Sequence, residues 1–280
     1  MKEHDGQIAE TLRASDRDRY LSVLYAPEEK RIGLYALYAF NAEIAAIRDR
    51  IREPLPGEIR LQWWRDVLAA PEGAGEGHPV AAALVKAIEA NDLPRAAFEN
   101  YLEARIFDLY DDPMPSRGDL EGYCGETASA IIQLAALILD PASAREHPDL
   151  AGHAGCAQAI TGILRLLPRH RARGQCYLPR DVLSAAGTSP EEFVAGDAPE
   201  AGRRAVEAMV ALANHHFAAF RQGARLLPET LRPAFLPLAL VPAFLKGMSR
   251  NPGQVLRAPA DMSELRRHWL MFRTATRGWP

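Results

Sequence analysis

Apolar residues recur at three- and four-residue steps along most of this chain. Within residues 28–51 they are Ile32, Tyr35, Leu37, Phe40, Ile44, Ile47 and Ile51. This spacing is typical of an amphipathic α-helix. Pro27 followed by two glutamates indicates the helix start, and Pro54 and Pro56 are expected to end it. Similar patterns predict further helices at about 57–70, 79–90, 95–110, 117–139, 150–167, 200–226, 232–250 and 261–274.

Loops are predicted where Gly, Pro, Ser and Asp cluster, at 71–79, 111–119 and 187–190. Few segments alternate between apolar and polar residues with a period of two, so the sequence predicts no sheet. No linker is long or low in complexity. We therefore expect one all-α domain over residues 1–280.

Composition and charge exclude several classes of protein. The 280 residues carry a formal net charge of −3, which gives no sign of nucleic-acid binding. The three cysteines, Cys124, Cys156 and Cys176, are odd in number and form no CxxC, so neither a disulfide framework nor a zinc site is expected. The first twenty residues lack an apolar core and contain five acids, unlike a secretory signal or a presequence. A cytoplasmic location is expected.

Two apolar stretches, 128–139 and 234–245, are about half as long as the ~20 residues that span a bilayer. Both are interpreted as core helices. The second contains Pro237 and Pro242 and leaves an alternative, in which it rests on the inner face of a membrane as a peripheral contact.

An ordered set of blocks carries a family resemblance. The main blocks are APEEKRIGLYALYAFNAEIAAIRD (26–49) with RLQWWRDVL (60–68), and GCAQAITGILRLLPRHRARGQCYLPRDVL (155–183). Between them lie HPVAAAL (78–84) and GYCGETASAII (122–132). In this order they resemble the squalene/phytoene synthase family, from about residue 15 to 250. The resemblance implies an isoprenoid (terpenoid) synthase-type helical bundle around a central cavity.

Active members of that family join two prenyl diphosphates head to head. Two aspartate-rich motifs on facing helices hold Mg²⁺ ions, which neutralise the departing diphosphate. Here the first motif reads Ala45, Ala46, Ile47, Arg48, Asp49, so a single carboxylate remains.

The second motif has lost both of its aspartates. The two aspartate positions are Leu166 and His170, and the preceding Gln and Asn positions are Ala159 and Gly162. Because Pro168 disfavours a continuing helix, His170 is expected to lie past the helix end. Tyr38, Arg165 and Tyr177 still match the family pattern, so the resemblance implies a retained scaffold without metal chemistry.

This combination is similar to one branch of the family, which includes a mitochondrial assembly factor of respiratory complex I. The implied function is non-catalytic, as a scaffold or assembly protein whose partner is a respiratory-complex subunit or another assembly protein. No cofactor or metal is expected. The alternative is a Mg²⁺-dependent prenyltransferase of the squalene/phytoene type with a rebuilt site, in which Asp49, Glu43 or Glu126 recruits the ion.

Arginines are concentrated around the second motif. Arg165, Arg169, Arg171 and Arg173 form a basic group that three interpretations fit: a solvated helix end, a partner surface, or an anion site. In the last case the arginines, with Tyr38 and Tyr177, hold an isoprenoid diphosphate or an anionic lipid head group. The adjacent pairs Trp63–Trp64 and His215–His216 are interpreted as packing residues rather than ligands.

Overall fold

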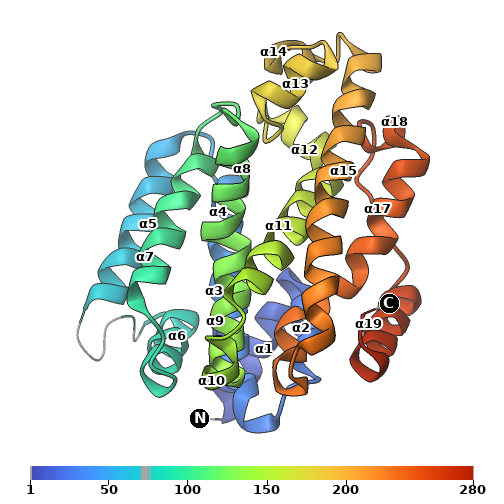
Figure 1. Cartoon of the computed structure of the whole chain (residues 1–280). Helices are drawn as coiled ribbons and strands as arrows, with labels where there is room; N and C mark the ends of the chain where they lie inside the picture. The colour runs from blue at the N-terminus through green and yellow to red at the C-terminus, as the bar shows by residue number, and fades with distance from the viewer. Residues whose placement is uncertain (1, 71–74, 76, 280) are drawn as a thin grey trace. The chain divides into compact units, whose positions relative to one another are not determined.

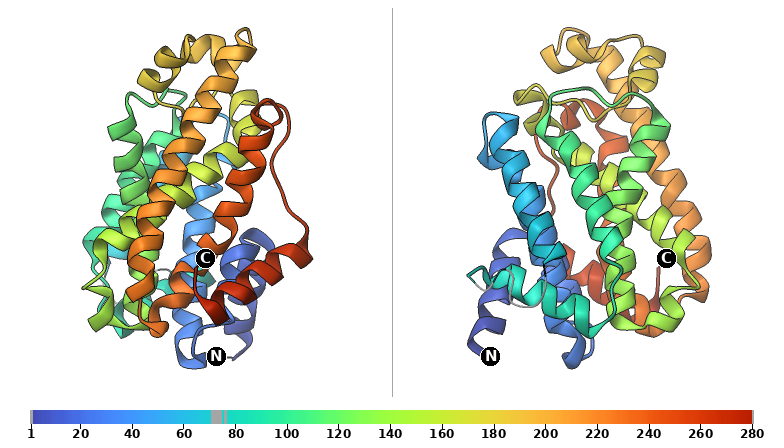
Figure 2. Two further views of the ribbon diagram at one scale, coloured as in Figure 1. Left: turned by 45° about the vertical axis from the view of Figure 1, so that its right-hand side comes forward. Right: turned by 90° about the vertical axis from the view of Figure 1, so that its left-hand side faces the viewer.

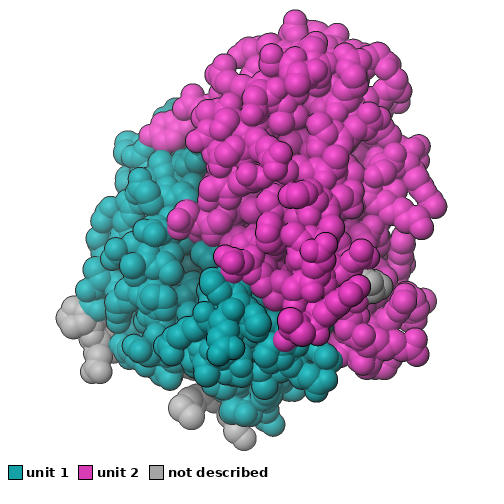
Figure 3. Space-filling model, viewed as in Figure 1, with its two compact units in different colours: residues 1–109, 130–148, 227–237 teal, residues 110–129, 149–226, 238–280 magenta. Residues whose placement is uncertain are grey.

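All regular structure in the described residues is helical. The computed structural model describes residues 2–70, 75 and 77–279, and no strand occurs among them (Figure 1). The predicted all-α class is confirmed. The chain divides into two compact units (Figure 3), and each unit is built from three separate segments.

Unit 1 comprises Met1–Leu109, Ala130–Pro148 and Leu227–Pro237. Its helices and 3₁₀ turns are α1 (Lys2–Ser15), α2 (Arg17–Val23), α3 (Glu28–Ala45), α4 (Ile47–Arg50), α5 (Pro54–Ala69), α6 (Pro79–Ala90), α7 (Arg95–Ala104), η1 (Arg105–Leu109), α9 (Ala130–Leu139), α10 (Pro141–Ala144), η4 (Glu229–Leu231) and α16 (Arg232–Phe235).

Unit 2 comprises Tyr110–Ser129, Asp149–Leu226 and Leu238–Pro280. Its elements are α8 (Arg117–Cys124), η2 (Gly125–Ser129), α11 (Pro148–Arg165), α12 (Leu167–Ala172), α13 (Arg180–Ala186), α14 (Pro190–Ala195), α15 (Pro199–Gly223), η3 (Ala224–Leu226), α17 (Val241–Arg250), α18 (Pro252–Val255) and α19 (Glu264–Arg277). The 3₁₀ turn η5 (Leu236–Leu240) contains the last boundary between the units.

The core of unit 1 forms around α3, which packs against α1, α6 and α9. Phe40 of α3 is fully buried and meets three aromatic rings, at centroid distances of 4.9 Å to Trp64, 5.8 Å to Phe98 and 5.4 Å to Tyr101. Such tilted and edge-on contacts add to the large apolar area that these rings bury. Of the two adjacent tryptophans, Trp64 is 4% exposed, whereas Trp63 is 39% exposed.

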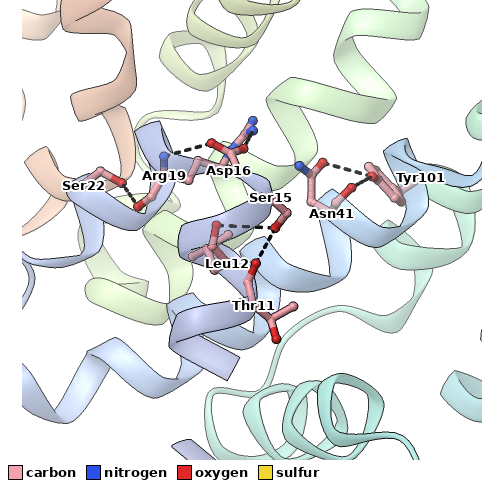
Figure 4. Close-up of polar contacts among 8 residues, drawn as sticks. All are labelled: Thr11, Leu12, Ser15, Asp16, Arg19, Ser22, Asn41 and Tyr101. Atoms are coloured by element: carbon pink, nitrogen blue, oxygen red, sulfur yellow. Dashed lines mark hydrogen bonds and ion pairs between the residues drawn. The ribbon is translucent and has the colours of Figure 1, made fainter. Parts of the chain in front are cut away.

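Polar groups inside unit 1 have specific partners (Figure 4). The buried Tyr101 hydroxyl donates to Asn41 Oδ1 at 3.0 Å, which joins α7 to α3. Asp16 caps α2 by accepting from Arg19 N at 3.1 Å, and it pairs with Arg19 Nη1 at 2.6 Å. The Arg19 guanidinium lies 5.6 Å from the centroid of the Tyr38 ring. These bonds offset the cost of burying the groups.

Unit 2 is organised around the long helix α15, which packs against α13, α17 and α18. The views in Figures 1 and 2 both place α15 beside α17. On α15 the buried His216 lies between two polar partners. Its Nδ1 is 3.0 Å from His153 Nδ1, and its Nε2 is 3.1 Å from Glu121 Oε1. This contact joins α15 to α8 and α11.

Helix α11 approaches η2, a π-helical turn, at Gly155. A Cβ atom built on Gly155 would lie 2.5 Å from Ser129 Cα and still closer to its N and Oγ atoms. Ser129 Oγ donates to Gly152 O at 3.0 Å across the same contact. Only glycine allows α11 to lie this close to the turn.

Several helix boundaries differ from the predicted ones. The predicted helix through residue 51 breaks at Ala46, and Pro54 begins α5 instead of only ending the preceding element. The run predicted at 117–139 contains the π-helical turn, and 232–250 is interrupted by η5. Helices α1, α2, α10, α12, α13, α14 and α18 were not predicted. In the loop predicted at 71–79, residues 71–74 and 76 lie outside the described residues.

Both apolar stretches serve as core, as predicted. Residues 117–139 and 229–250 are long and apolar enough to cross a membrane, but 61% and 72% of their windows are buried within the protein. The alternative that 234–245 rests on a membrane is wrong for the folded chain, because side chains such as Phe235, Leu238 and Leu245 are buried. The three cysteines are buried and free.

The contact at Gly155 yields the first prediction. Gly155→Ala should lower the free energy of unfolding by about 1–3 kcal/mol or more, because its methyl group must force α11 away from η2. The matched control is Gly162→Ala on the same helix, where a Cβ meets nothing within 4 Å. That control should gain up to about 1 kcal/mol from helix propensity. Equal unfolding free energies of the two variants in urea titrations would refute this account.

The second prediction concerns pH. Burial lowers the pKa of His216 below its ordinary value, against the Glu121 hydrogen bond that raises it. The unfolded chain therefore takes up a proton below about pH 6.5 while His216 in the folded chain resists it, so acidification reduces stability. In urea unfolding, the free energy of unfolding of the His216→Asn variant should fall less between about pH 7 and pH 5 than that of the unchanged protein.

The exposed His268 supplies the control for this comparison. His268→Asn should follow the pH dependence of the unchanged protein. Parallel curves for His216→Asn and the unchanged protein would show that His216 does not contribute to it.

Candidate functional site

The first motif position lies where α3 ends. Ala45 is the last residue of α3 and is exposed, and Ala46 adopts φ −85° and ψ −4° between α3 and α4. Asp49 is exposed on the four-residue helix α4. The break turns the chain between Ala45 and Asp49, so these positions do not share one continuous helical face.

Glu43 is engaged by a neighbouring helix of unit 1. Its Oε2 lies 3.4 Å from His78 Nε2, and His78 contacts the rings of Trp63 and Trp64. Burial raises the pKa of the Glu43 carboxyl, although His78 and Arg50 oppose the rise. Glu43 therefore braces α3 against the start of α6.

The second motif position is also a helix break. Helix α11 ends at Arg165, and Leu166 is 40% exposed at φ −100° and ψ 5°. Pro168 stands in the first turn of the separate helix α12, where its missing N–H costs nothing. The prediction that His170 lies past the end of a helix is correct only for α11, because His170 belongs to α12.

The four predicted arginines do not converge on one point. Arg165 lies 4.1 Å over the ring of Phe244, donates to Ala260 O at 3.3 Å and lies 3.9 Å from Asp261 Oδ1. It braces the end of α11. Arg171 instead donates to Leu256 O at 3.1 Å and to Val194 O at 3.5 Å.

The remaining predicted residues occupy different surroundings. Arg169 is exposed and Arg173 is half-buried. Tyr177 is buried in unit 2, with its ring centroid 4.8 Å from that of His170 and 6.1 Å from that of Tyr123. Tyr38 is buried in unit 1, where burial raises the pKa of its hydroxyl.

These residues do not fit the Mg²⁺ ions that the family resemblance implies. Mg²⁺ prefers carboxylate oxygens, and Ala45, Ala46, Leu166 and His170 supply none. In residues 2–70, 75 and 77–279, no three His, Cys, Asp or Glu side chains are grouped as a metal site would require. Glu126, proposed for a rebuilt site, is an exposed residue of η2. No catalytic step can be derived through a metal here.

Sequence reasoning missed two groups of residues. One is the contact of Glu121, His216 and His153, whose members are distributed over three helices. The other is a set of arginines from α15, α17 and the segment after α18, which line one pocket together with Arg171. The only local signal is the pair Arg203–Arg204, because the other members lie far apart in sequence.

The chain is similar in sequence to an assembly factor and to a phytoene synthase. The chain is 31% identical over 248 residues to the human protein named NADH dehydrogenase (ubiquinone) complex I, assembly factor 6, covering 88% of this chain and 74% of the human one. It is 30% identical over 194 residues to a phytoene synthase of Thermus thermophilus, covering 68% of this chain and 64% of that enzyme.

Solved structures agree on the architecture. The squalene synthase HpnC of Alicyclobacillus acidocaldarius superposes with a TM-score of 0.73 at 22% identity, covering 92% of this chain and 96% of that one. A dehydrosqualene synthase superposes with a TM-score of 0.78 at 19% identity, covering 98% and 96%. The sequence profile described as squalene/phytoene synthase matches residues 12–270. With this match over nearly its whole length, the chain belongs to the squalene/phytoene synthase family.

Proposed function

We propose that this chain is a non-catalytic member of its family that assists the assembly of a respiratory NADH dehydrogenase complex. The observation that carries the proposal is that Ala45, Ala46, Leu166 and His170 stand at the motif positions of a chain whose residues 12–270 match the family profile. The names of the relatives support the assembly role, since the bovine protein, 32% identical over 244 residues, is also a complex I assembly factor 6.

The physical argument against catalysis concerns charge. Ionisation of an allylic diphosphate leaves several negative charges on the leaving group, and these must be neutralised as the bond breaks. The substitutions at Ala45, Ala46, Leu166 and His170 leave no carboxylates at these positions, and the two helix breaks interrupt the continuous faces that would align such groups. A synthase with a rebuilt site would need another set of oxygen ligands.

We propose that α19 is the face through which the protein rests on an anionic membrane surface, on the cytoplasmic side. Leu265, Trp269 and Phe272 recur at steps of four and three, and they are 83%, 54% and 59% exposed. They form an apolar stripe, and α19 contains four arginines and one acidic residue. An exposed apolar stripe flanked by arginines suits an interface of lipid tails and anionic head groups.

The assembly role is tested by complementation. This chain, directed to mitochondria in human cells that lack complex I assembly factor 6, should restore part of the assembled complex I and its NADH dehydrogenase activity. Native gels and activity staining measure both, with the empty vector as control. In parallel, the purified protein with farnesyl diphosphate and Mg²⁺ should form no more product than buffer. Failure to complement would remove the assembly role, and product formation would favour the enzyme.

The membrane contact is tested by sedimentation with vesicles. The protein should pellet with phosphatidylglycerol vesicles, and Trp269→Ser with Phe272→Ser should weaken this binding by about tenfold or more, because two large apolar side chains leave the interface. Leu226→Ser, at an exposed leucine of η3, is the control. Unchanged binding of the double variant would exclude α19 as the contact.

A further inference from the structure

Unit 2 contains a pocket that the proposed function does not use. Its volume is about 890 Å³, and it lies between the first turns of α15, the end of α14 and the corner from α17 to α18. Figure 1 shows these elements at the same end of α15. The volume falls within the range of about 300–1,000 Å³ that is usual for small-molecule sites.

Positive charge prevails in this pocket. The lining contains five arginines and two glutamates, which are Arg171, Arg203, Arg204, Arg250, Arg257, Glu200 and Glu207. One of the glutamates, Glu200, already pairs with Arg203. An excess of guanidinium groups around one concave site attracts anions.

Arg171 and Arg204 are held by backbone carbonyls. Arg171 bonds to Leu256 O and Val194 O, and Arg204 Nε and Nη2 donate to Ala186 O at 3.0 and 2.8 Å. Carbonyl groups orient a guanidinium without cancelling its charge. Arg171 Nε is buried, and no acceptor in the described part of the chain reaches it. This arrangement leaves fixed donors and uncompensated charge.

Gly196 shapes the wall beside Arg171. It ends α14 in the left-handed region at φ 88°, and a Cβ there would lie 2.6 Å from Arg171 Nη2. The positive φ favours glycine, and a Cβ there would displace the end of the Arg171 side chain. The backbone thus makes room for the guanidinium at the edge of the pocket.

Arg250 and Arg257 complete the positive set from the other side. Both are exposed, and neither has an acidic partner within residues 2–70, 75 and 77–279. The 25-residue helix α15 also begins at the pocket, and its N-cap residue Ala198 provides no side-chain cap. The free N–H groups of its first turn add to the positive potential.

We propose that this pocket binds a soluble phosphorylated small molecule with two or more negative charges, without a metal ion. Guanidinium groups fork onto phosphate oxygens, and several of them around one pocket favour a compact polyanion over a single carboxylate. The buried ring of Phe193 lies 5.4 Å from the Arg171 guanidinium at the pocket wall and helps to hold that group in place.

The experiment is calorimetric titration of the full chain with inorganic pyrophosphate at low salt in the presence of EDTA. Saturable binding is expected. Arg250→Ala with Arg257→Ala should weaken it by about tenfold or more, because two charged donors are lost from exposed positions that brace no other element. Arg145→Ala with Arg225→Ala, which removes two exposed arginines outside the pocket, is the charge-matched control and should bind as the unchanged protein does.

Three results would overturn the proposal. The first is no heat of binding at millimolar pyrophosphate, and the second is equal weakening in the pocket and control variants, which indicates unspecific attraction. The third is a combination of two observations: the unchanged protein does not bind pyrophosphate, and the pocket variant, but not the control variant, loses binding to phosphatidylglycerol vesicles. This combination assigns the pocket to a lipid head group. Complementation by the pocket variant is measured separately, so that failure of this site is distinguishable from failure of the assembly role.

Discussion

Helix α11 can lie against the turn η2 only because residue 155 has no side chain, and much of unit 2 depends on that approach. The contact fixes the helix that carries His153 and ends at Arg165. His153 then meets His216 of α15, and Arg165 meets Phe244 of α17. The positions of α15 and α17 are thereby coupled to one close backbone contact. The π-helical geometry of η2 places Ser129 where its hydroxyl bonds to α11.

The two motif positions differ from the family pattern in their backbone as well as in their side chains. One helix ends just before Ala46 and another just before Leu166, at the two motif positions where the family resemblance implies carboxylates. Replacement of a metal ligand removes only a side chain, whereas a helix break also removes the alignment of its neighbours. Both changes agree with a scaffold kept for a role other than ionising a diphosphate.

Arginine in this protein has two distinct tasks. Arg165 is packed on an aromatic ring and lies near Asp261, so it stabilises the junction between α11 and the segment before α19. Arg171 and Arg204 are oriented by carbonyl groups and keep an uncompensated charge at a pocket. The difference lies in the partner, because an acidic partner neutralises a guanidinium and a carbonyl only positions it.

Much of the fold follows from local patterns. The helical period around Phe40, the order of the family blocks and the missing aspartates at Ala45, Ala46, Leu166 and His170 are properties of the sequence read locally. They gave the all-α class, the family and the reasons to expect no metal chemistry. Helix ends were less predictable. The π-helical turn before Ala130, for example, does not change the spacing of apolar residues enough to be recognised from the sequence.

The tertiary structure decided which distant residues meet. Both units are built from segments that are separated by many residues. For this reason the arginines that are close together in sequence, Arg165 to Arg173, are not the set that lines one pocket in the folded chain. Arg171 instead joins Arg204, Arg250 and Arg257, and Glu121 joins His216. The physical reason is that side-chain chemistry and helical period act over a few residues. The pairing of helices depends on close contacts, such as that at Gly155, between residues far apart in the sequence.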